Sequence, residues 1–389
     1  MFEFFPGDYS LNLAANIALS TGAQLGDLER ACGTLRAELA KRDASQDERT
    51  RLMAEGCARV GDELSRQAEV DFKAGRNLSA SDKYMRANVL LQMAERAQSH
   101  LRPGWEALYS RVLDSFRNAI VSGGHNCEFI EIPYPVAGST IPGLLTTPQR
   151  QPPSSTPCLI FLNGLDSTKE MVYGSRLPGE LEARGVSTLA IDQPGTGEAL
   201  RLRGLTGVVE SELYATAALE FLAENGLADP NRIGIGGWSL GGYFAPRAAA
   251  YEPRFQACAA WGAVYDYGEI QRRRAANEEG SNRPVPHYWE HVRWAFGCAS
   301  KEDWLEFSQG MNLAAVSERI RCPYLIVHGS NDRQIPGEFA QRQLDAARNS
   351  PDAELAWVTP EQGGIEHVGA DNMRFSVSYI ADWVSEVLV

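Results

Sequence analysis

Apolar positions in the first third of the chain follow a helical period. They recur every three or four residues, as in Leu28, Cys32, Leu35, Trp105, Leu108 and Val112. Such spacing places one apolar stripe along each helix. Only two of the twenty prolines lie before residue 126, which leaves long stretches without a helix-breaking residue. We expect residues 1–122 to form an all-helical N-terminal domain, in which Ser79 and Ser81 are candidate N-caps of one helix.

After Gly123-Gly124 the pattern changes to short runs of β-branched and apolar residues. Alternating or continuous apolar runs predict strands at 129–132, 141–147, 158–162, 186–191, 233–235, 257–261, 324–327 and 355–358. Helical patterns such as 210–224 lie between most of them. Buried strands that alternate with helices indicate a mainly parallel α/β sheet over residues 123–389. The stretch 265–313 interrupts this alternation and contains eight aromatic residues, which predicts a helical lid insertion.

The clearest chemical motif is Gly237-Trp238-Ser239-Leu240-Gly241, directly after the apolar run that begins at Ile233. A G-x-S-x-G sequence between a strand and a helix is typical of the nucleophile elbow of α/β hydrolases. Its glycines leave room for a tight turn that lifts the serine hydroxyl above the edge of the sheet. The alternative, a dinucleotide-binding turn, would need a glycine at position 239. We therefore expect an α/β-hydrolase fold with Ser239 as the nucleophile.

A serine hydroxyl needs a base, and the base needs an acid that orients it. In α/β hydrolases these follow the serine in the order acid, then histidine. Asp332 follows the apolar run 324–327, and His367 is the only histidine beyond it. We therefore predict Asp332 as the acid and His367 as the base, with His328 as the rival base.

An oxyanion hole takes one N–H from the residue after the nucleophile and a second from the loop after the third strand. The first of these is the N–H of Leu240. The second loop is Asn163 to Glu170, in which the N–H of Leu165 is our candidate.

The charge and the cysteine content of the chain indicate which kinds of partner and which cellular location to expect. The 37 basic and 50 acidic residues give a net charge of −13, which disfavours a nucleic-acid partner and attraction to anionic lipid. No apolar run is long enough for a membrane span. The seven cysteines are scattered and odd in number, which favours free thiols over disulfides or a metal site. With the absence of a signal-peptide pattern at the N-terminus, they lead us to expect a cytoplasmic location.

Several segments resemble one α/β-hydrolase family, that of 2,6-dihydroxypseudooxynicotine hydrolase and the fungal polyketide-shortening hydrolases of the yellowish-green pigment type. Asn163 to Glu170 is similar to its G-G-L-x-S-T-K-E segment, and Asp192 to Glu198 to its D-x-P-G-x-G-E segment. Gly237 to Gly242 and Trp261-Gly262 match as well. The resemblance is strong over about 158–389 and weaker in the helical part.

The resemblance implies hydrolysis of a carbon–carbon bond next to a ketone by a serine triad, without metal or organic cofactor. It assigns Ser239, Asp332 and His367 the roles of nucleophile, acid and base. It also implies a helical N-terminal domain that covers the active site and pairs two copies of the chain as a homodimer. A further glutamate beyond the Trp-Gly segment corresponds to Glu269. With Tyr265 and Trp238, it is a candidate for contacting substrate or donating a proton.

The predicted substrate is a small ketonic or aromatic molecule, such as a β-dicarbonyl, an acyl-arene or a polyketide-like compound. Departure of carbon requires a delocalised carbanion and an acid to protonate it. The lid aromatics would stack on such a substrate or form ordinary core. A carboxylesterase or thioesterase, and an acyltransferase or cyclase, are alternatives that use the same triad. A prolyl peptidase is disfavoured, because 122 helical residues cannot supply a β-propeller cap.

Overall fold

The structure is a computed structural model that describes residues 1–39, 45–149, 152–277 and 282–389. The chain divides into two compact units. One comprises Met1–Asn126 with Asn282–His291, and the other Cys127–Ser281 with Val292–Val389. The predicted insertion 265–313 therefore contributes to both units, and its residues 278–281 lie outside the described part of the chain.

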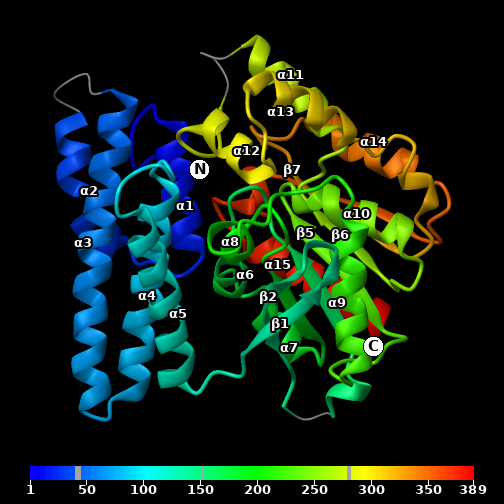
Figure 1. Cartoon of the computed structure of the whole chain (residues 1–389), viewed down its shortest axis with the longest axis horizontal. Coiled ribbons are helices and arrows are strands. Elements are labelled where there is room, and N and C mark those ends of the chain that lie inside the picture. Colours follow the sequence, from blue (N-terminus) through cyan, green and yellow to red (C-terminus); the bar gives the residue numbers. More distant parts are fainter. Residues whose placement is uncertain (40–44, 150–151, 278–281) are drawn as a thin grey trace. The chain divides into compact units, whose positions relative to one another are not determined.

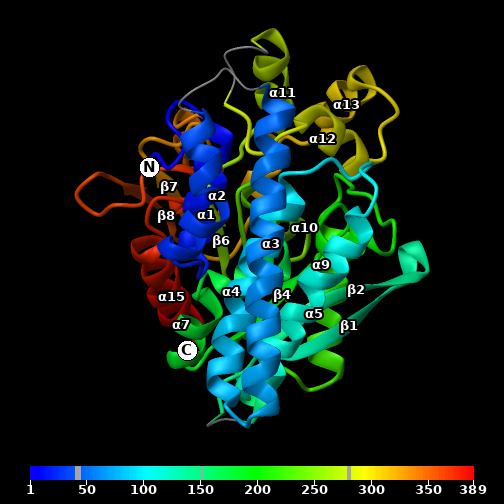
Figure 2. The same ribbon diagram turned by 90° about the vertical axis from the view of Figure 1, so that its left-hand side faces the viewer.

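The first unit is helical. Its helices before residue 124 are α1 (Tyr9–Ser20), α2 (Leu25–Leu39), α3 (Gln46–Lys73), α4 (Asn77–Arg96) and α5 (Trp105–Gly123). The long helix α3 packs along α4, and α4 along α5, as Figures 1 and 2 show. The expected caps were wrong, because α4 begins at Asn77 after Arg76, without a side-chain cap. The Ser81 hydroxyl instead donates to the carbonyl of Ala119 on α5.

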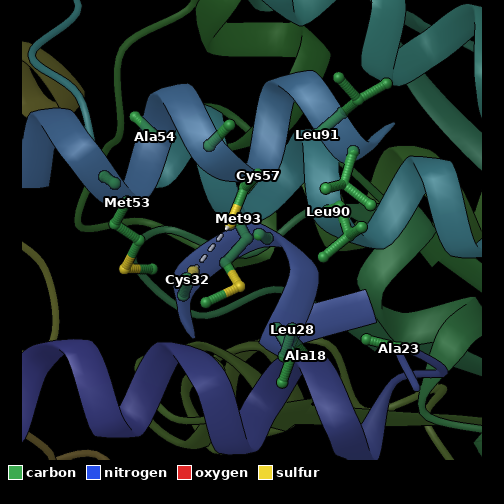
Figure 3. Packing of buried hydrophobic residues seen from close by; sticks show 14 of the residues in the cluster. Ala18, Ala23, Leu28, Cys32, Met53, Ala54, Cys57, Leu90, Leu91 and Met93 are labelled. Atoms are coloured by element: carbon green, nitrogen blue, oxygen red, sulfur yellow. Dashed lines mark hydrogen bonds between the residues drawn. The ribbon is translucent and has the colours of Figure 1, made fainter. Parts of the chain in front are cut away.

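The core of the helical unit is formed by apolar side chains from α1 to α5. Figure 3 shows part of this core, with residues of α1 to α4 labelled. Leu28, Leu90 and Leu91 are almost completely buried there. Two cysteines meet in the same core, and the Sγ atoms of Cys32 and Cys57 are 3.7 Å apart. Like the other five cysteines, they are free thiols.

The second unit is built around an eight-stranded sheet with strand order β1-β2-β4-β3-β5-β6-β7-β8. The strands are β1 (Glu128–Tyr134), β2 (Ser139–Thr146), β3 (Cys158–Leu162), β4 (Ser187–Ile191), β5 (Ile233–Trp238), β6 (Cys258–Trp261), β7 (Tyr324–Gly329) and β8 (Ala353–Val358). Strand β2 pairs antiparallel with both β1 and β4. The other six strands, β3 to β8, all run parallel to one another. The predicted α/β-hydrolase fold is confirmed.

Helices cover both faces of this sheet. Those of the second unit are α6 (Lys169–Gly174), α7 (Leu177–Ala183), α8 (Gly197–Arg201), α9 (Glu212–Glu224), α10 (Gly241–Tyr251), α11 (Tyr267–Ala276), α13 (Lys301–Phe307), α14 (Glu338–Ala346) and α15 (Arg374–Leu388). Helix α12 (Tyr288–Phe296) begins in the helical unit and ends in this one. Helices α7 and α15 pack together on one face, and α9 and α10 on the other (Figures 1 and 2).

The parallel strands bring distant residues to one edge. Because β3, β5, β7 and β8 share a direction, the loops that follow them emerge at the same carboxyl edge, where open α/β sheets bind ligands. These loops contain Leu165, Ser239, Asp332 and His367. Among the described residues, no helix is long and apolar enough to cross a membrane.

Candidate active site

Ser239 lies in a strained turn between β5 and α10. Its φ is +56°, a left-handed conformation that non-glycine residues adopt rarely and that is frequent at functional sites. The flanking glycines are required by close backbone contacts. A Cβ on Gly237 would lie 2.6 Å from the carbonyl oxygen of Gly241, and a Cβ on Gly241 would lie 2.7 Å from that of Leu162. The turn therefore has the geometry of a nucleophile elbow.

The structure brings Ser239, His367 and Asp332 into one chain of hydrogen bonds. Ser239 Oγ is 2.8 Å from His367 Nε2, and His367 Nδ1 is 2.8 Å from Asp332 Oδ2. A carboxylate only accepts hydrogen bonds, so Nδ1 carries the proton and Nε2 presents its lone pair to the serine hydroxyl. This is the tautomer that a general base needs.

The carboxylate of Asp332 is held by backbone groups. Its Oδ1 accepts the N–H groups of Gln334 and Ile335 at 2.8 and 3.0 Å, which leaves Oδ2 to His367. The side chain is 1% exposed. Burial alone would raise the pKa of the Asp332 carboxyl, but the charge and hydrogen bond of His367 bring it below its ordinary value. Asp332 is therefore an anion that can stabilise a protonated His367.

The loop of His367 is strained directly after the histidine. Val368 has a φ of +46°, which is a genuine outlier for a β-branched residue. Glu366, on the other side of His367, accepts a two-pronged hydrogen bond from the Arg333 guanidinium at 3.0 Å and a third from Asn331 at 2.9 Å. Since Asn331 and Arg333 flank Asp332, Glu366 connects the loop of Asp332 to the loop of His367.

The predicted oxyanion loop lies against the elbow. A Cβ added to Gly164 would lie 2.9 Å from the Cβ of Ser239, so the backbone before Leu165 touches the serine. Leu165 and Leu240 are 5% and 2% exposed. Leu240 is the N-cap of α10, and the N–H groups at a helix start have no acceptor within the helix. The structure thus places Leu240 directly after Ser239 in the turn, and the residue before Leu165 in contact with Ser239.

A buried group of charges supports this loop. Lys169 Nζ lies 2.7 Å from a carboxylate oxygen of Glu170 and 3.0 Å from those of Asp192 and Glu198. The Asp192 carboxylate also accepts the Lys169 N–H and the side-chain amide of Asn163, at 2.7 and 3.0 Å. Burial raises the pKa of Asp192 above its ordinary value, and attraction to Lys169 offsets this only in part. The described residues contain no group of three or more His, Cys, Asp or Glu side chains arranged to hold a metal ion.

The three auxiliary candidates have structural partners. Trp238 is 3% exposed, and its indole N–H donates to Ser167 at 2.9 Å. Tyr265 is 8% exposed, and its ring lies under the guanidinium of Arg342, with 4.4 Å between the ring centre and the guanidinium carbon. Glu269 accepts hydrogen bonds from Arg342 and Arg273, and the bond from Arg342 contributes most to lowering the pKa of its carboxyl below the ordinary value.

The histidine that reaches Ser239 is His367. The rival His328 is buried at the end of β7, where it stacks on Trp357 with ring centres 5.5 Å apart. Its Nδ1 accepts the N–H of Ala263 at 3.2 Å. Burial lowers the pKa of His328, so its ring stays neutral.

Aromatic residues of the predicted lid pack largely on one another. Trp304 is completely buried, and its ring centre lies 4.7 Å from that of Phe296 and 5.9 Å from that of Tyr267. Its indole N–H donates to Gln271 at 3.2 Å. These three rings form core within the second unit.

Some residues that hold the site were not singled out from the sequence. Glu366 and Arg333 are 33 positions apart, and their pairing depends on the register of β7 and β8. Lys169 and Asp192 belong to segments that carried the family resemblance, but no role was assigned to them. An aspartate that directly follows a buried strand, as Asp192 follows β4, was a usable signal, because a buried charge requires a partner.

A mostly parallel sheet with a serine in a tight strand–turn–helix defines this protein as an α/β hydrolase. Two family models each match more than half of the chain. One is described as the prolyl oligopeptidase family and covers residues 181–388, and the other is described as esterase FrsA-like and covers residues 61–270. The chain therefore belongs to the prolyl oligopeptidase family of hydrolases, and it shares the FrsA-like esterase pattern over its middle part.

Individual relatives agree with this class and with the resemblance noted in the sequence. The 2,6-dihydropseudooxynicotine hydrolase of Paenarthrobacter nicotinovorans is 28% identical over 336 residues, which cover 85% of this chain and 83% of the relative. The hydrolase acrC of Aspergillus aculeatus is 30% identical over 83% of this chain and 82% of its own. The crystal structure of 2,6-dihydroxy-pseudo-oxynicotine hydrolase has a similar fold, with a TM-score of 0.74 at 23% identity over 96% of both chains. The protein is a hydrolase.

Proposed function

We propose that this protein is a serine hydrolase that cleaves a carbon–carbon bond next to a ketone. Ser239 acts as nucleophile, His367 as base and Asp332 as the acid that orients it. The observation that carries the proposal is the chain of 2.8 Å contacts from Ser239 Oγ through His367 to Asp332. The carbon–carbon specificity rests on the resemblance to the family of the pseudooxynicotine hydrolase.

In the first step Ser239 Oγ attacks the ketone carbon while its proton passes to His367 Nε2. The imidazolium formed in this way is stabilised by the Asp332 carboxylate. Negative charge develops on the former carbonyl oxygen, which accepts hydrogen bonds from the N–H groups of Leu240 and Leu165. A single donor of this kind lowers the barrier by roughly 3 kcal/mol.

In the second step the bond between the carbonyl carbon and its α-carbon breaks. The electron pair leaves on the α-carbon, where a neighbouring carbonyl or phenol ring must delocalise it. The proton on His367 passes to that carbon and leaves an acyl-serine. Water, deprotonated by His367, then releases a carboxylic acid and restores Ser239.

His367 is a better proton donor for this step than Glu269. The pairing of Glu269 with Arg342 and Arg273 keeps its pKa below the ordinary value, so it is ionised at neutral pH. We expect Glu269→Gln to leave the pH profile of kcat unchanged. If the pH profile of kcat loses its acid or alkaline limb in that variant, Glu269 and not His367 is the proton donor.

A carboxylesterase is the second candidate. The match of residues 61–270 to an FrsA-like esterase model favours it, and an ester loses an alkoxide without requiring a stabilised carbanion. The same elbow, base and oxyanion donors would serve both reactions.

Product analysis separates the two candidates. Acylphenols, 1,3-diketones and simple esters are incubated with the protein, with Ser239→Ala as the blank, and the products are identified by mass spectrometry. A carboxylic acid with the deacylated ring or ketone, absent from the blank, is the expected result. Turnover of esters alone would leave the triad and refute carbon–carbon cleavage, while full activity of Ser239→Ala would refute the serine mechanism.

The role of the helical residues 1–122 as a cap and dimerisation domain stays a prediction drawn from the resemblance and the apolar helix stripes. Light scattering of the full chain tests the homodimer directly. A monomer at the concentrations used for activity would contradict it.

A further inference from the structure

The hydroxyl of Ser167 uses its full hydrogen-bonding capacity. It accepts the backbone N–H of Gly164 at 2.8 Å and the indole N–H of Trp238 at 2.9 Å, and it donates to the side-chain oxygen of Asn163 at 2.9 Å. A hydroxyl has one proton and two lone pairs, so no capacity remains. Ser167, Trp238 and Asn163 are 6%, 3% and 0% exposed, so water does not substitute readily for any of these bonds.

These bonds join the two backbone segments that carry the proposed oxyanion donors. Trp238 directly precedes Ser239 in the elbow, whose next residue is Leu240. Gly164 directly precedes Leu165, and a Cβ on Gly164 would lie 3.3 Å from the carbonyl oxygen of Trp238. The relative placement of the two N–H groups therefore depends on the contact that Ser167 makes with Trp238.

The other end of the Ser167 network is fixed to β4. The Asn163 side-chain amide donates to the carbonyl of Ile191 at 2.8 Å and to Asp192 at 3.0 Å. The backbone N–H and carbonyl of Asn163 both bond to the Gln193 side chain, at 3.0 and 2.9 Å. Ser167 thus ties the elbow to a loop that is itself held at the end of the neighbouring strand.

We infer that Ser167 is a positioning residue that sets the geometry of the oxyanion hole by bonding the loop of Leu165 to Trp238. This inference rests on the proposed function of Ser239. Oxyanion donors act by being aimed at the developing charge before reaction. A small displacement of a donor therefore reduces stabilisation of the transition state more than it reduces binding of the substrate. The indole N–H of Trp238 consequently donates to Ser167 rather than to a substrate, and Trp238 contributes to catalysis only through this bond.

The test compares Ser167→Ala with Ser175→Ala. Ser175 is a matched control, because its hydroxyl is also buried and hydrogen-bonded. It donates to the carbonyl of Val172 at 2.6 Å and accepts the N–H of Leu177 at 3.3 Å. The readouts are kcat and KM for p-nitrophenyl acetate and the inhibition constant of a phenyl trifluoromethyl ketone, which forms a tetrahedral adduct with a serine. We expect Ser167→Ala to lower kcat by about 10- to 100-fold, below the roughly 10²–10³-fold loss for complete removal of a donor.

The pattern of effects distinguishes positioning from mere stability. KM should stay within about twofold while the inhibition constant weakens by the same factor as kcat, as expected for an interaction made in the transition state. Ser175→Ala should change neither. If Ser167→Ala lowers only the melting temperature, with kcat and inhibitor affinity intact, the inference is wrong.

Trp238→Phe supplies a second variant if Ser167→Ala fails to fold. It removes the indole donor and keeps the bonds of Ser167 to Gly164 and Asn163. The same split between kcat and KM is expected, and the double variant should be no worse than Ser167→Ala alone. Fully additive losses would contradict the shared role. Activity retained by Ser239→Ala would instead refute the proposed function, independently of these variants.

Discussion

Replacing Lys169 with methionine removes the cation shared by three carboxylates and keeps most of the side-chain volume. Lys169 is 2% exposed and lies 2.7 to 3.0 Å from oxygens of Glu170, Asp192 and Glu198. Removing one partner of a buried ion pair costs about 3–5 kcal/mol, because the remaining charge is left without compensation. Protonation limits this cost. Each pKa unit is worth 1.36 kcal/mol, so keeping a carboxyl with an ordinary pKa near 3.9 protonated at pH 7 costs about 4 kcal/mol. We therefore expect Lys169→Met to lower the free energy of unfolding by about 3–5 kcal/mol at pH 7.

The loss should shrink as the pH falls. Burial already raises the pKa of Asp192, and without Lys169 the pKa would rise further. A folded state that binds the proton more tightly than the unfolded chain loses stability as the pH rises from about 4 to the folded pKa. The deficit of Lys169→Met is therefore largest near neutral pH and is relieved by acid.

Hydrogen exchange of peptides from β3 and β4, and from α3 for the control, measures this change during urea unfolding, because it follows each unit separately. Lys73→Met is the matched control. Lys73 pairs with Glu69 on the exposed side of α3, where the two side chains are 71% and 55% exposed, so little change is expected. Equal unfolding midpoints for the two variants, or a larger Lys169→Met deficit in acid, would refute the reasoning.

Three further variants test other parts of the site. Glu366→Gln should lower kcat several-fold with little change in KM, because it weakens the two-pronged bond to Arg333, and steady-state kinetics check this. Asp332→Asn should make the free energy of unfolding fall less steeply as the pH is lowered. The folded-state pKa of Asp332 is lowered, so its stabilisation is present above the unfolded pKa near 3.9 and is lost as the pH falls through the folded value; urea midpoints from pH 2 to 6 measure it. Gly242→Ala should cost about 1–3 kcal/mol in thermal unfolding, because the new methyl group would overlap the carbonyl oxygen of Gly262.

The fold was predictable where a single segment carries its own signal. The apolar run 158–162 corresponds to β3 residue for residue, because a strand buried on both faces must be apolar throughout. The elbow was predictable for a similar reason, since Gly237, Ser239 and Gly241 lie within five consecutive residues and the turn excludes side chains at the two glycines. The order of acid and histidine along the chain then sufficed to choose Asp332 and His367.

Features that depend on distant partners could not be predicted in this way. The hydroxyl of Ser81 was expected to cap a helix, but α5 offers it the carbonyl of Ala119 once the helices have packed. Glu366 gives no local sign that it will bond Arg333, because their contact exists only after β7 and β8 have paired. The partner of Trp238 is likewise 71 residues away, at Ser167.

The contacts around Ser239 fix the reaction centre more firmly than they select a leaving group. Glu366 holds the loops of Asp332 and His367 together, and Ser167 with Asp192 holds the loop of Leu165 against the elbow. None of these groups distinguishes a ketone from an ester, because both substrates form the same tetrahedral oxyanion. The difference arises when the intermediate collapses, since a carbon leaving group must be both delocalised and protonated. With Glu269 ionised between two arginines, the proposed mechanism takes that proton from His367, and under this proposal the stability of the departing carbanion decides which ketones can react.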